Sequence, residues 1–390
     1  MYVIYLTRLN VRKPMDKYLF LYLMTGGGHY SPAKAIAKSI RDKCGTNAEI
    51  VLHDGLNGAR PYVRTIIEDG YKTSVTRALW SFEILYALNK IKSVSRFTID
   101  LVSQMVKQGI KEVILKERPY KIVIFHYFLI KPVLEVLQEN SLKVSVLIVV
   151  TDPYTAPLGW FHYENQNFIV FSDKLKEKCK RMGIESKNIQ VFPFVLDQKF
   201  SGPSGVRSEF QIRKDLGFRE DSRIVLILGG GDGMPRGKRI FRNLVSSGIE
   251  AEIAVICGRD QKLFDHLTKL VELYKLQNVR IFGYIDFVDT LIQISDVVIT
   301  KAGPSVCMEI LLAGKVPIIN NYIWEQEKGN MEFVCRGGMG IYQRNTAHLP
   351  EVVKSLFNDS EYYNSLTNNI KNRGIENGVG KVSEYILNFN

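Results

Sequence analysis

The chain has 390 residues, of which 46% are hydrophobic and 24% are charged. This composition is that of a folded protein with two or three domains, and it excludes a disordered chain, a collagen-like chain and a coiled coil. The residues up to Val195 contain 28 basic and 17 acidic side chains, whereas the remainder contains 24 and 23. The first half therefore carries +11 of the net charge of +12, which favours a polyanion or an anionic membrane surface as its partner.

The amino-terminal residues and the cysteines bear on the compartment. MYVIYLTRLNVRKPMDKYLF lacks the pattern of a secretory signal, because its apolar run is short and the charges follow that run. The five cysteines are scattered and lack zinc-ligand spacing, which favours reduced thiols. No uncharged apolar run reaches the roughly 18 residues of a membrane-spanning helix. We expect a cytoplasmic protein, peripheral on the inner face of the cell membrane, with Met15 as an alternative start that would make residues 1–14 an extension.

Short apolar runs alternate with stretches of helical periodicity along the chain. Several runs are continuous, which is typical of strands in a parallel sheet covered by helices on both faces. The expected strands are 18–24, 122–127, 144–150, 168–172, 224–229, 251–258, 279–284, 296–300 and 316–321. Helices are expected over 32–43, 235–247 and 261–276. This alternation predicts an α/β protein with doubly wound parallel sheets.

A break in this pattern divides the chain. Residues 195–211 gather Gly and Ser around one Pro before a new strand begins, as an interdomain linker does. Each half then opens with a strand, three glycines and a helix, in YLMTGGGHYSPAKAIAKSI and in LILGGGDGMPRGKRIFRNL. We predict two Rossmann-like domains, 1–200 and 201–390, that face one another across a cleft. The last helix is a candidate for packing back on the first domain.

Residues 56–118 fit this scheme less well, because they form a long, mostly helical and basic stretch. Within it, RALWSFEILYALNKIKSVSRF (77–97) spaces its apolar side chains along one helical face, with Lys90, Lys92 and Arg96 close by. Such a face is typical of a helix that packs on the core. It is also typical of a basic amphipathic element that dips into a bilayer surface. Both interpretations stay open.

The two glycine triplets place backbone N–H groups and a positive helix end where an anionic ligand can bind. Neither is a dinucleotide fingerprint, because Ser31 and Met234 stand at the third glycine position. The second is not a P-loop, because Asp232 and Arg239 replace two of the residues which that motif requires. His29 stands where the first strand meets its helix, and there it is either a general base or a residue without chemistry.

A more specific group of residues occupies 296–333. A buried strand ends at Thr300, and Gly303, Pro304 and Ser305 then open a helix in a way that suits a diphosphate. Glu309 follows one turn later and can accept two hydrogen bonds from a ribose diol. The polar loop 325–330 then offers the carboxylate and amide groups that sugar hydroxyls require.

Five segments, in this order and spacing, carry a family resemblance. They are TGGGHYSPAKAIA (25–37), VTDPYTAPLGWFH (150–162), LGGGDGM (228–234), ITKAGPS (299–305) and QEKGN (326–330). Over nearly its whole length the chain resembles the inverting GT-B glycosyltransferases of the monogalactosyldiacylglycerol synthase and processive diacylglycerol glucosyltransferase group. That group is related to the lipid-linked N-acetylglucosaminyltransferase of peptidoglycan synthesis.

The resemblance implies that the second domain binds a UDP-sugar and the first binds diacylglycerol at an anionic membrane. By position, the residues implied for the donor are Gly230, Gly231, Gly303, Pro304 and Ser305 at the diphosphate, Phe282, Gly283 and Tyr284 at uracil, Glu309 at the ribose, and Gln326, Glu327 and Asn330 at the sugar. His29 would be the base or would orient the acceptor hydroxyl, and Asp152 is a second candidate base. The acceptor side would include Gly27, Gly28, Tyr30 and Trp160.

The implied reaction moves galactose or glucose to the 3-hydroxyl of diacylglycerol with inversion, giving a β-glycosyl lipid. We expect backbone N–H groups, with Lys301 or Arg236, to meet the charge of the departing UDP. No metal ion and no other cofactor is therefore expected. The alternatives are a lipid-linked N-acetylglucosaminyltransferase and a UDP-sugar epimerase. A nucleic-acid-binding protein is suggested only by charge, and no motif supports it.

Overall fold

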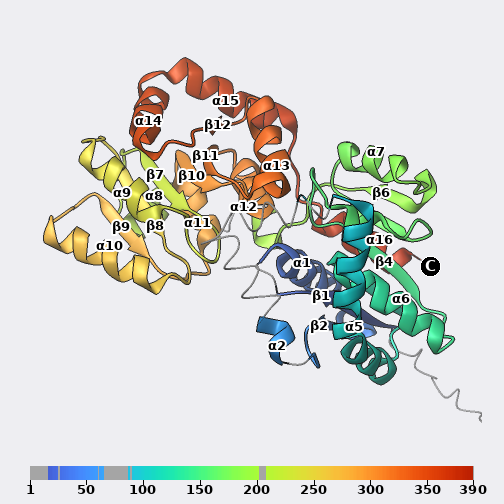
Figure 1. Cartoon of the computed structure of the whole chain (residues 1–390). Coiled ribbons are helices and arrows are strands. Elements are labelled where there is room, and N and C mark those ends of the chain that lie inside the picture. Colours follow the sequence, from blue (N-terminus) through green and yellow to red (C-terminus); the bar gives the residue numbers. More distant parts are fainter. Residues whose placement is uncertain are drawn as a thin grey trace, which may run out of the picture.

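The computed structural model describes residues 16–24, 27–59, 61–65, 87, 90–201 and 208–389. Two six-stranded parallel sheets lie side by side, each with helices on both faces (Figure 1). The first sheet has the order β2-β1-β3-β4-β5-β6. Its strands are β1 (Asp16–Tyr22), β2 (Ala48–Asp54), β3 (Lys121–Ile124), β4 (Ser145–Val149), β5 (Asn167–Val170) and β6 (Ile189–Val191).

The second sheet has the order β12-β11-β10-β7-β8-β9, which is the Rossmann arrangement with its first strand, β7, at the centre. Its strands are β7 (Ile224–Leu228), β8 (Glu252–Ile256), β9 (Val279–Phe282), β10 (Val297–Lys301), β11 (Val316–Asn321) and β12 (Ile341–Tyr342). The predicted fold class, an α/β protein with two Rossmann-like halves, is confirmed. The predicted domain boundaries at 200 and 201 stay a prediction, because residues 202–207 lie outside the described residues.

Burial on both faces explains why the strand sequences are continuously apolar. Phe20 of β1 packs in the core on one face of the first sheet, whereas Leu19 and Leu21 pack in the core on the other face. All nine expected strands are present. Three further strands, β2, β6 and β12, are not among them. The last two span three and two residues, which is too short for a pattern, and β2 mixes apolar residues with Glu49 and His53.

The helices follow the apolar spacing of the sequence. Helix α1 (Gly27–Cys44), for example, buries Ala33, Ile36, Ala37 and Ile40 against the first sheet. The other helices among the described residues of the first half are α2 (Pro61–Arg64), α5 (Lys92–Glu117), α6 (Ile130–Glu139) and α7 (Asp173–Arg181). Most of the helix expected over 77–97 lies outside the described residues. None of the described helices is both long and apolar enough to cross a membrane.

Helices of the second half surround the second sheet, and the last helix leaves it (Figure 1). They are α8 (Glu209–Asp215), α9 (Gly237–Ser246), α10 (Gln261–Leu273), α11 (Val288–Ile294), α12 (Pro304–Leu312), α13 (Trp324–Arg336), α14 (Leu349–Asn358), α15 (Ser360–Arg373) and α16 (Val379–Asn388). Helix α16 packs along α1 of the first half, where Lys43 Nζ donates to the carbonyl of Gly380 at 2.9 Å. The chain therefore passes between the halves twice.

Lys121 anchors this last helix from inside the first half. It lies at the start of β3, fully buried, and its ammonium donates to the carbonyl of Ile386 at 2.5 Å and to that of Phe389. These carbonyls are at the end of α16, where the helix dipole favours a cation. The rings of Tyr18 and Tyr120 lie 5.6 and 5.5 Å from the same nitrogen. A buried lysine thus joins residues that are far apart in the chain.

Lys121 predicts an unusual dependence of stability on pH. Burial lowers its pKa from 10.5 to about 8. Between these two pH values the unfolded chain binds a proton that the folded chain has released. The contribution of Lys121 to the free energy of unfolding therefore rises with pH. We expect the free energy of unfolding of the wild type to rise from pH 8 to pH 10 relative to that of Lys121→Met, measured by urea denaturation. The exposed Lys143→Met variant is the control, and an equal pH slope in wild type and Lys121→Met would contradict the prediction.

Candidate functional site

Both sheets have a point at which successive connections leave in opposite directions, and ligands of open α/β sheets bind there. In the first sheet this point lies between β1 and β3, and in the second between β7 and β10. His29 follows β1, while Gly230 and Gly231 follow β7 and Gly303 follows β10. The topology therefore places these four residues next to the switch points of the two sheets.

His29 lies in the first turn of α1 and is held by the ends of two neighbouring strands. Its Nδ1 is 2.9 Å from the carbonyl oxygen of Phe125 and 2.7 Å from Oγ1 of Thr151. Because a carbonyl oxygen only accepts, Nδ1 carries the hydrogen, and the Thr151 oxygen shares it. The neutral ring then has its lone pair on Nε2. This is the tautomer that a general base needs when a backbone carbonyl orients the ring.

Asp152 follows β4 and completes the surroundings of His29. Its Oδ2 accepts a hydrogen bond from Nε1 of Trp160 at 3.0 Å. Burial lowers the pKa of His29 below its usual value, and the nearby charge of Asp152 partly opposes this change. Burial raises the pKa of Asp152, against the influence of His29 and of the Trp160 hydrogen bond. His29 is therefore neutral and able to accept a proton at pH 7.

His126, which the sequence reasoning did not single out, lies against His29. It follows β3, it is buried, and its ring centroid is 4.5 Å from that of His29 at an interplanar angle of 63°. The signal was present in the sequence: the run IVIFHY has a histidine as its last residue but one, at the carboxyl end of a strand beside the switch point. That neighbourhood becomes visible only once β3 is known to pair with β1.

The other residues implied for the acceptor side have different surroundings. A side chain at Gly28 would meet open space, which leaves room next to His29. The ring of Tyr30 packs on Tyr22 with centroids 4.9 Å apart. Trp160 lies in the short η4 turn (Leu158–Phe161) and is fully buried. It therefore holds the Asp152 carboxylate in place. Gly27 opens α1, next to residues 25–26, which lie outside the described residues.

The glycine loop after β7 is shaped by close backbone contacts. A Cβ at Gly229 would lie 2.2 Å from the carbonyl oxygen of Gly233, and one at Gly258 would lie 2.5 Å from that of Gly231. Gly230 has a φ of 90°, which disfavours other residues. The loop thus folds onto the turn after β8, where Arg259 N–H donates to Gly231 at 2.9 Å.

The start of α12 has the form expected for an anion site. Gly303 is the N-cap and Pro304 occupies the first helical position, followed by the half-buried Ser305. Lys301 ends β10, and its Nζ donates to Oε1 of Glu327 at 2.9 Å. The sequence reasoning treated these two side chains separately, one for the diphosphate and one for the sugar. The structure joins them in an ion pair whose carboxylate is almost fully buried.

Helix α13 carries the other residues implied for the sugar. Oε2 of Glu327 accepts the N–H of Ile323 at 2.7 Å and so caps α13, while Asn330 Nδ2 donates to the carbonyl of Ala302 at 2.9 Å. Gln326 faces the first half instead, and its Nε2 is 3.4 Å from Oδ1 of Asp152. The Thr155 hydroxyl also donates to the carbonyl of Gln326 at 2.6 Å. These contacts join the donor side to the candidate base region.

The residues implied for uridine are spread more widely. Glu309 is half-buried in α12, and burial raises the pKa of its carboxyl to about 7. Phe282 and Gly283 are half-buried at the end of β9, and the ring of Tyr284 is stacked by Arg259, whose guanidinium carbon is 4.9 Å from the ring centroid. Arg236 has a φ of 60°, and its guanidinium donates to the carbonyl of Arg344 at 3.3 Å.

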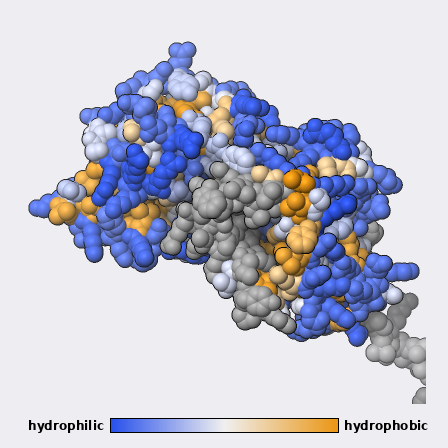
Figure 2. All heavy atoms as spheres, in the orientation of Figure 1, coloured by the Kyte–Doolittle hydropathy of each residue, from blue (hydrophilic) through white to orange (hydrophobic). Residues whose placement is uncertain are grey.

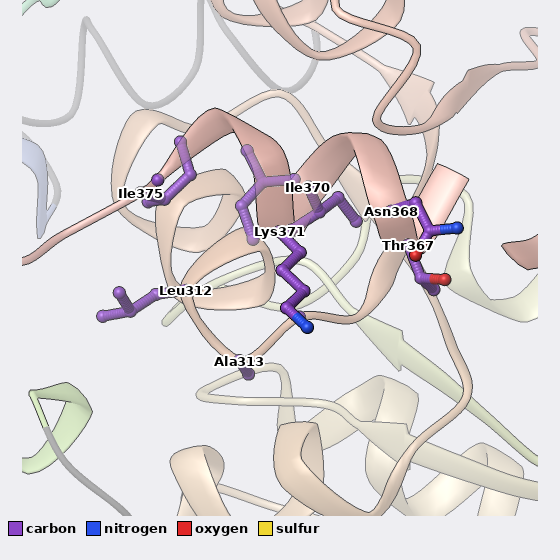
Figure 3. A pocket seen from close by; sticks show the side chains of 10 residues that line it. Leu312, Ala313, Thr367, Asn368, Ile370, Lys371 and Ile375 are labelled. Atoms are coloured by element: carbon purple, nitrogen blue, oxygen red, sulfur yellow. The ribbon is translucent and has the colours of Figure 1, made fainter. Parts of the chain in front are cut away.

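A cavity of about 440 Å³ lies at the opposite end of α12 (Figure 3). It is lined by the carboxyl end of this helix and by α15, including Leu312, Thr367, Lys371 and Ile375. It is separate from the residues expected to bind the diphosphate, because those residues lie at the first turn of α12. Among the described residues, no group of three or more His, Cys, Asp or Glu side chains is arranged to hold a metal ion.

Comparison with protein families matches both halves of the chain. The family model for monogalactosyldiacylglycerol (MGDG) synthase matches residues 29–195, and that for the glycosyltransferase family 28 C-terminal domain matches residues 224–379. The first half of the chain is therefore similar to the MGDG synthase family, and the second half is similar to the glycosyltransferase family 28 C-terminal domain. The match to the MGDG synthase model begins at His29 and includes Asp152 and Trp160, and the second match includes the glycine loop and the start of α12.

Individual relatives of this family agree. A probable MGDG synthase of Nicotiana tabacum is 26% identical over 356 residues, and MGDG synthase 1 of Arabidopsis thaliana is 27% identical over 353 residues. These alignments cover 88% and 87% of this chain, but only 65% and 64% of the two relatives. The chain therefore spans less than two thirds of the length of these MGDG synthases.

Solved structures show the same architecture. MurG of Acinetobacter baumannii superimposes with a TM-score of 0.60 at 13% identity, covering 95% of this chain and 99% of that chain. The S. aureus MnaA–UDP co-structure also gives a TM-score of 0.60 at 13% identity, with coverages of 96% and 95%. At this identity these likenesses bear on the GT-B fold alone.

Proposed function

We propose that this chain is an inverting hexosyltransferase that moves a sugar from a UDP-sugar to diacylglycerol, with galactose as the favoured sugar. The observation that carries the proposal is the orientation of His29: the Phe125 carbonyl holds its Nδ1–H and so leaves the lone pair on Nε2, while Gln326 of the second half contacts the adjoining Asp152. The names of the relatives support galactose and diacylglycerol. Glucose is the alternative sugar.

The proposed reaction is one displacement. His29 Nε2 takes the proton of the acceptor 3-hydroxyl as its oxygen forms a bond to the anomeric carbon of the sugar. The bond from that carbon to the diphosphate breaks on the opposite face, and UDP leaves with the electron pair. Backbone N–H groups of the 229–233 loop and of the first turn of α12, with the Lys301 ammonium, meet the growing negative charge. The product is a β-glycoside.

Transfer of label tests this proposal. The purified chain is incubated with labelled UDP-galactose or UDP-glucose and diacylglycerol micelles, and lipids are extracted into organic solvent. Label in a glycolipid that depends on diacylglycerol supports the proposal, and the preferred nucleotide identifies the sugar. Label confined to an altered nucleotide sugar would instead identify an epimerase, and label requiring a polyprenyl-linked acceptor would identify a lipid-linked N-acetylglucosaminyltransferase or a relative of it.

We also propose that α5 brings the acceptor side to the bilayer. One face of α5 packs on the first sheet through Val102, Val106 and Ile110, whereas Phe97 and Leu101 on another face are 70% and 45% exposed. Apolar side chains gather over this helix in Figure 2. Ser95 of the same helix lies 2.9 Å from His162, which directly follows the η4 turn that contains Trp160.

Charge favours an anionic bilayer as the occupant of this surface. Lys92 and Arg96 lie on the first turns of α5, beside Phe97, and the half of the chain that contains them has the net charge of +11. Each basic residue near an anionic membrane contributes on the order of 1 kcal/mol, and salt weakens this attraction. A bilayer bound to this surface of α5 lies close to the η4 turn, whose Trp160 donates a hydrogen bond to Asp152.

Vesicle flotation tests the α5 surface. We expect Phe97→Ser to lower the fraction bound to vesicles of anionic lipid by roughly tenfold, because it removes the apolar contribution of one inserted ring. Arg96→Gln should lower binding at low salt more than at high salt. The matched control is Leu273→Ser on α10, which is also 70% exposed but belongs to the second half. Equal binding by the Phe97 and Leu273 variants would contradict the proposal.

A further inference from the structure

His126 occupies a position from which a second group can reach the acceptor hydroxyl. It comes directly after β3, as His29 comes after β1, and these strands are neighbours in the first sheet. The two imidazole rings are in edge contact at 4.5 Å, and both lie 6.4 Å from the Trp160 ring. Two buried histidines therefore share one small space at the ligand-binding edge.

The backbone fixes the hydrogen of His126 on the nitrogen opposite to that of His29. The N–H of Phe128 donates to Nδ1 of His126 at 3.2 Å, so this nitrogen carries the lone pair and the hydrogen is on Nε2. Burial, together with the neighbouring His29, lowers the pKa of His126 well below its usual value, which keeps the ring neutral. No described residue accepts a hydrogen bond from this Nε2–H.

The pair is complementary to an alcohol that is losing a proton. Such an alcohol donates its hydrogen to a base and accepts a hydrogen bond on its oxygen, and the accepted bond strengthens as the oxygen becomes negative. His29 offers a lone pair on Nε2, and His126 offers an N–H on Nε2. A single neutral histidine cannot present both functions to one oxygen atom.

We propose that Nε2–H of His126 holds the oxygen of the acceptor hydroxyl and so aims its hydrogen at His29. This inference rests on the proposed transferase function. In the reaction His29 gains the acceptor proton while His126 keeps its own, so the charge that develops on the oxygen is met without a second proton transfer. His126 is then a catalytic residue for transfer to the lipid.

Two substitutions separate this role from that of a helix cap. The side chain of His126→Gln reaches as far as Nε2 and keeps a donor there, but it loses the acceptor for the Phe128 N–H. The side chain of His126→Asn keeps an acceptor near Nδ1 and loses the donor. We expect kcat for transfer to diacylglycerol to fall on the order of 10²-fold in His126→Asn, and less than about tenfold in His126→Gln.

Two further measurements make the test specific. Thermal unfolding should be disturbed more by His126→Gln, which loses the cap, than by His126→Asn. Hydrolysis of the UDP-sugar without lipid should fall less than transfer in His126→Asn, since small water molecules can be positioned in other ways. UDP binding by calorimetry should be unchanged in both variants.

The outcomes also distinguish this inference from the function on which it rests. If the wild type transfers sugar to diacylglycerol but His126→Asn does so equally well, the inference on His126 is overturned and the transferase stands. Loss of transfer in His126→Gln alone would assign His126 the role of a cap. Absence of transfer by the wild type would overturn the proposed function, and the inference with it.

Discussion

Replacing His29 with alanine is expected to lower kcat for sugar transfer by roughly 10³-fold, within the range that general bases contribute. The reason is the fixed tautomer: Phe125 and Thr151 hold Nδ1–H, which leaves Nε2 free to take the acceptor proton. UDP binding should be unchanged within about twofold, because His29 belongs to the first half of the chain and the proposed diphosphate site belongs to the second. Steady-state transfer assays and calorimetry with UDP measure the two quantities.

The matched control is His162→Gln. His162 is a half-buried histidine of the same half of the chain, and its Nε2 contacts Ser95 rather than His29 or His126. It should retain most of the transfer activity. A loss equal to that of His29→Ala would show that the effect is general to this half of the chain. Retention of activity by His29→Ala would exclude His29 as the base and favour Asp152.

The pH profile gives His29 a second signature. Its pKa is lowered by burial, so the base is neutral at pH 7 and activity falls only as the pH drops through a value below 6.5. The charge of Asp152 raises the pKa of His29, so Asp152→Asn should move this acidic limb of kcat to still lower pH. A limb that stays in place or moves upward in Asp152→Asn would contradict this assignment.

The second large effect is expected at Glu327. Glu327→Ala removes the acceptor proposed for sugar hydroxyls, the partner of Lys301 and the cap of α13 in one step. We expect kcat/KM for the UDP-sugar to fall by roughly 10³-fold, since each lost hydrogen bond to a charged group costs about 1.5–3 kcal/mol. The free energy of unfolding should fall by about 1–3 kcal/mol, because the Ile323 N–H and the Lys301 ammonium each lose a hydrogen-bond acceptor.

Glu327→Gln separates sugar recognition from stability. The amide oxygen can still accept the Ile323 N–H, but the negative charge is lost. UDP, which lacks the transferred hexose, should bind this variant at least as tightly as the wild type, because Lys301 no longer has a competing carboxylate. The UDP-sugar should still lose roughly tenfold or more in kcat/KM. Equal losses for UDP and the UDP-sugar would contradict a sugar-specific role, and Glu325→Gln on the same helix is the control.

Residues whose position depends on local sequence were predictable. Gly303, Pro304 and Ser305 open a helix because proline suits its first turn, and β10 before them begins with three apolar residues. His29 was found in the same way, from the strand, the glycines and the helix around it. The nine expected strands rest on the same principle, since burial on both faces leaves a plain apolar pattern.

Residues whose role depends on distant partners were not predictable. His126 gains significance from β3 lying beside β1, across about a hundred residues of chain. The pairing of Lys301 with Glu327, and the reach of Gln326 to Asp152, require α13 to be folded against β10 and against the other half. The burial of Lys121 was not predictable for the same reason, because the sequence around a lysine at the start of a strand does not indicate that it is fully buried.

The return of α16 to the first half has a consequence for biosynthesis. Until residues 379–389 have left the ribosome, the Lys121 ammonium has none of the carbonyl partners that Ile386 and Phe389 supply, and the side of α1 that contacts α16 stays uncovered. While the second half is translated, the nascent first half therefore lacks the contacts that α16 supplies. Deletion of residues 379–389 should accordingly destabilise the first half of the chain, where the acceptor is proposed to bind.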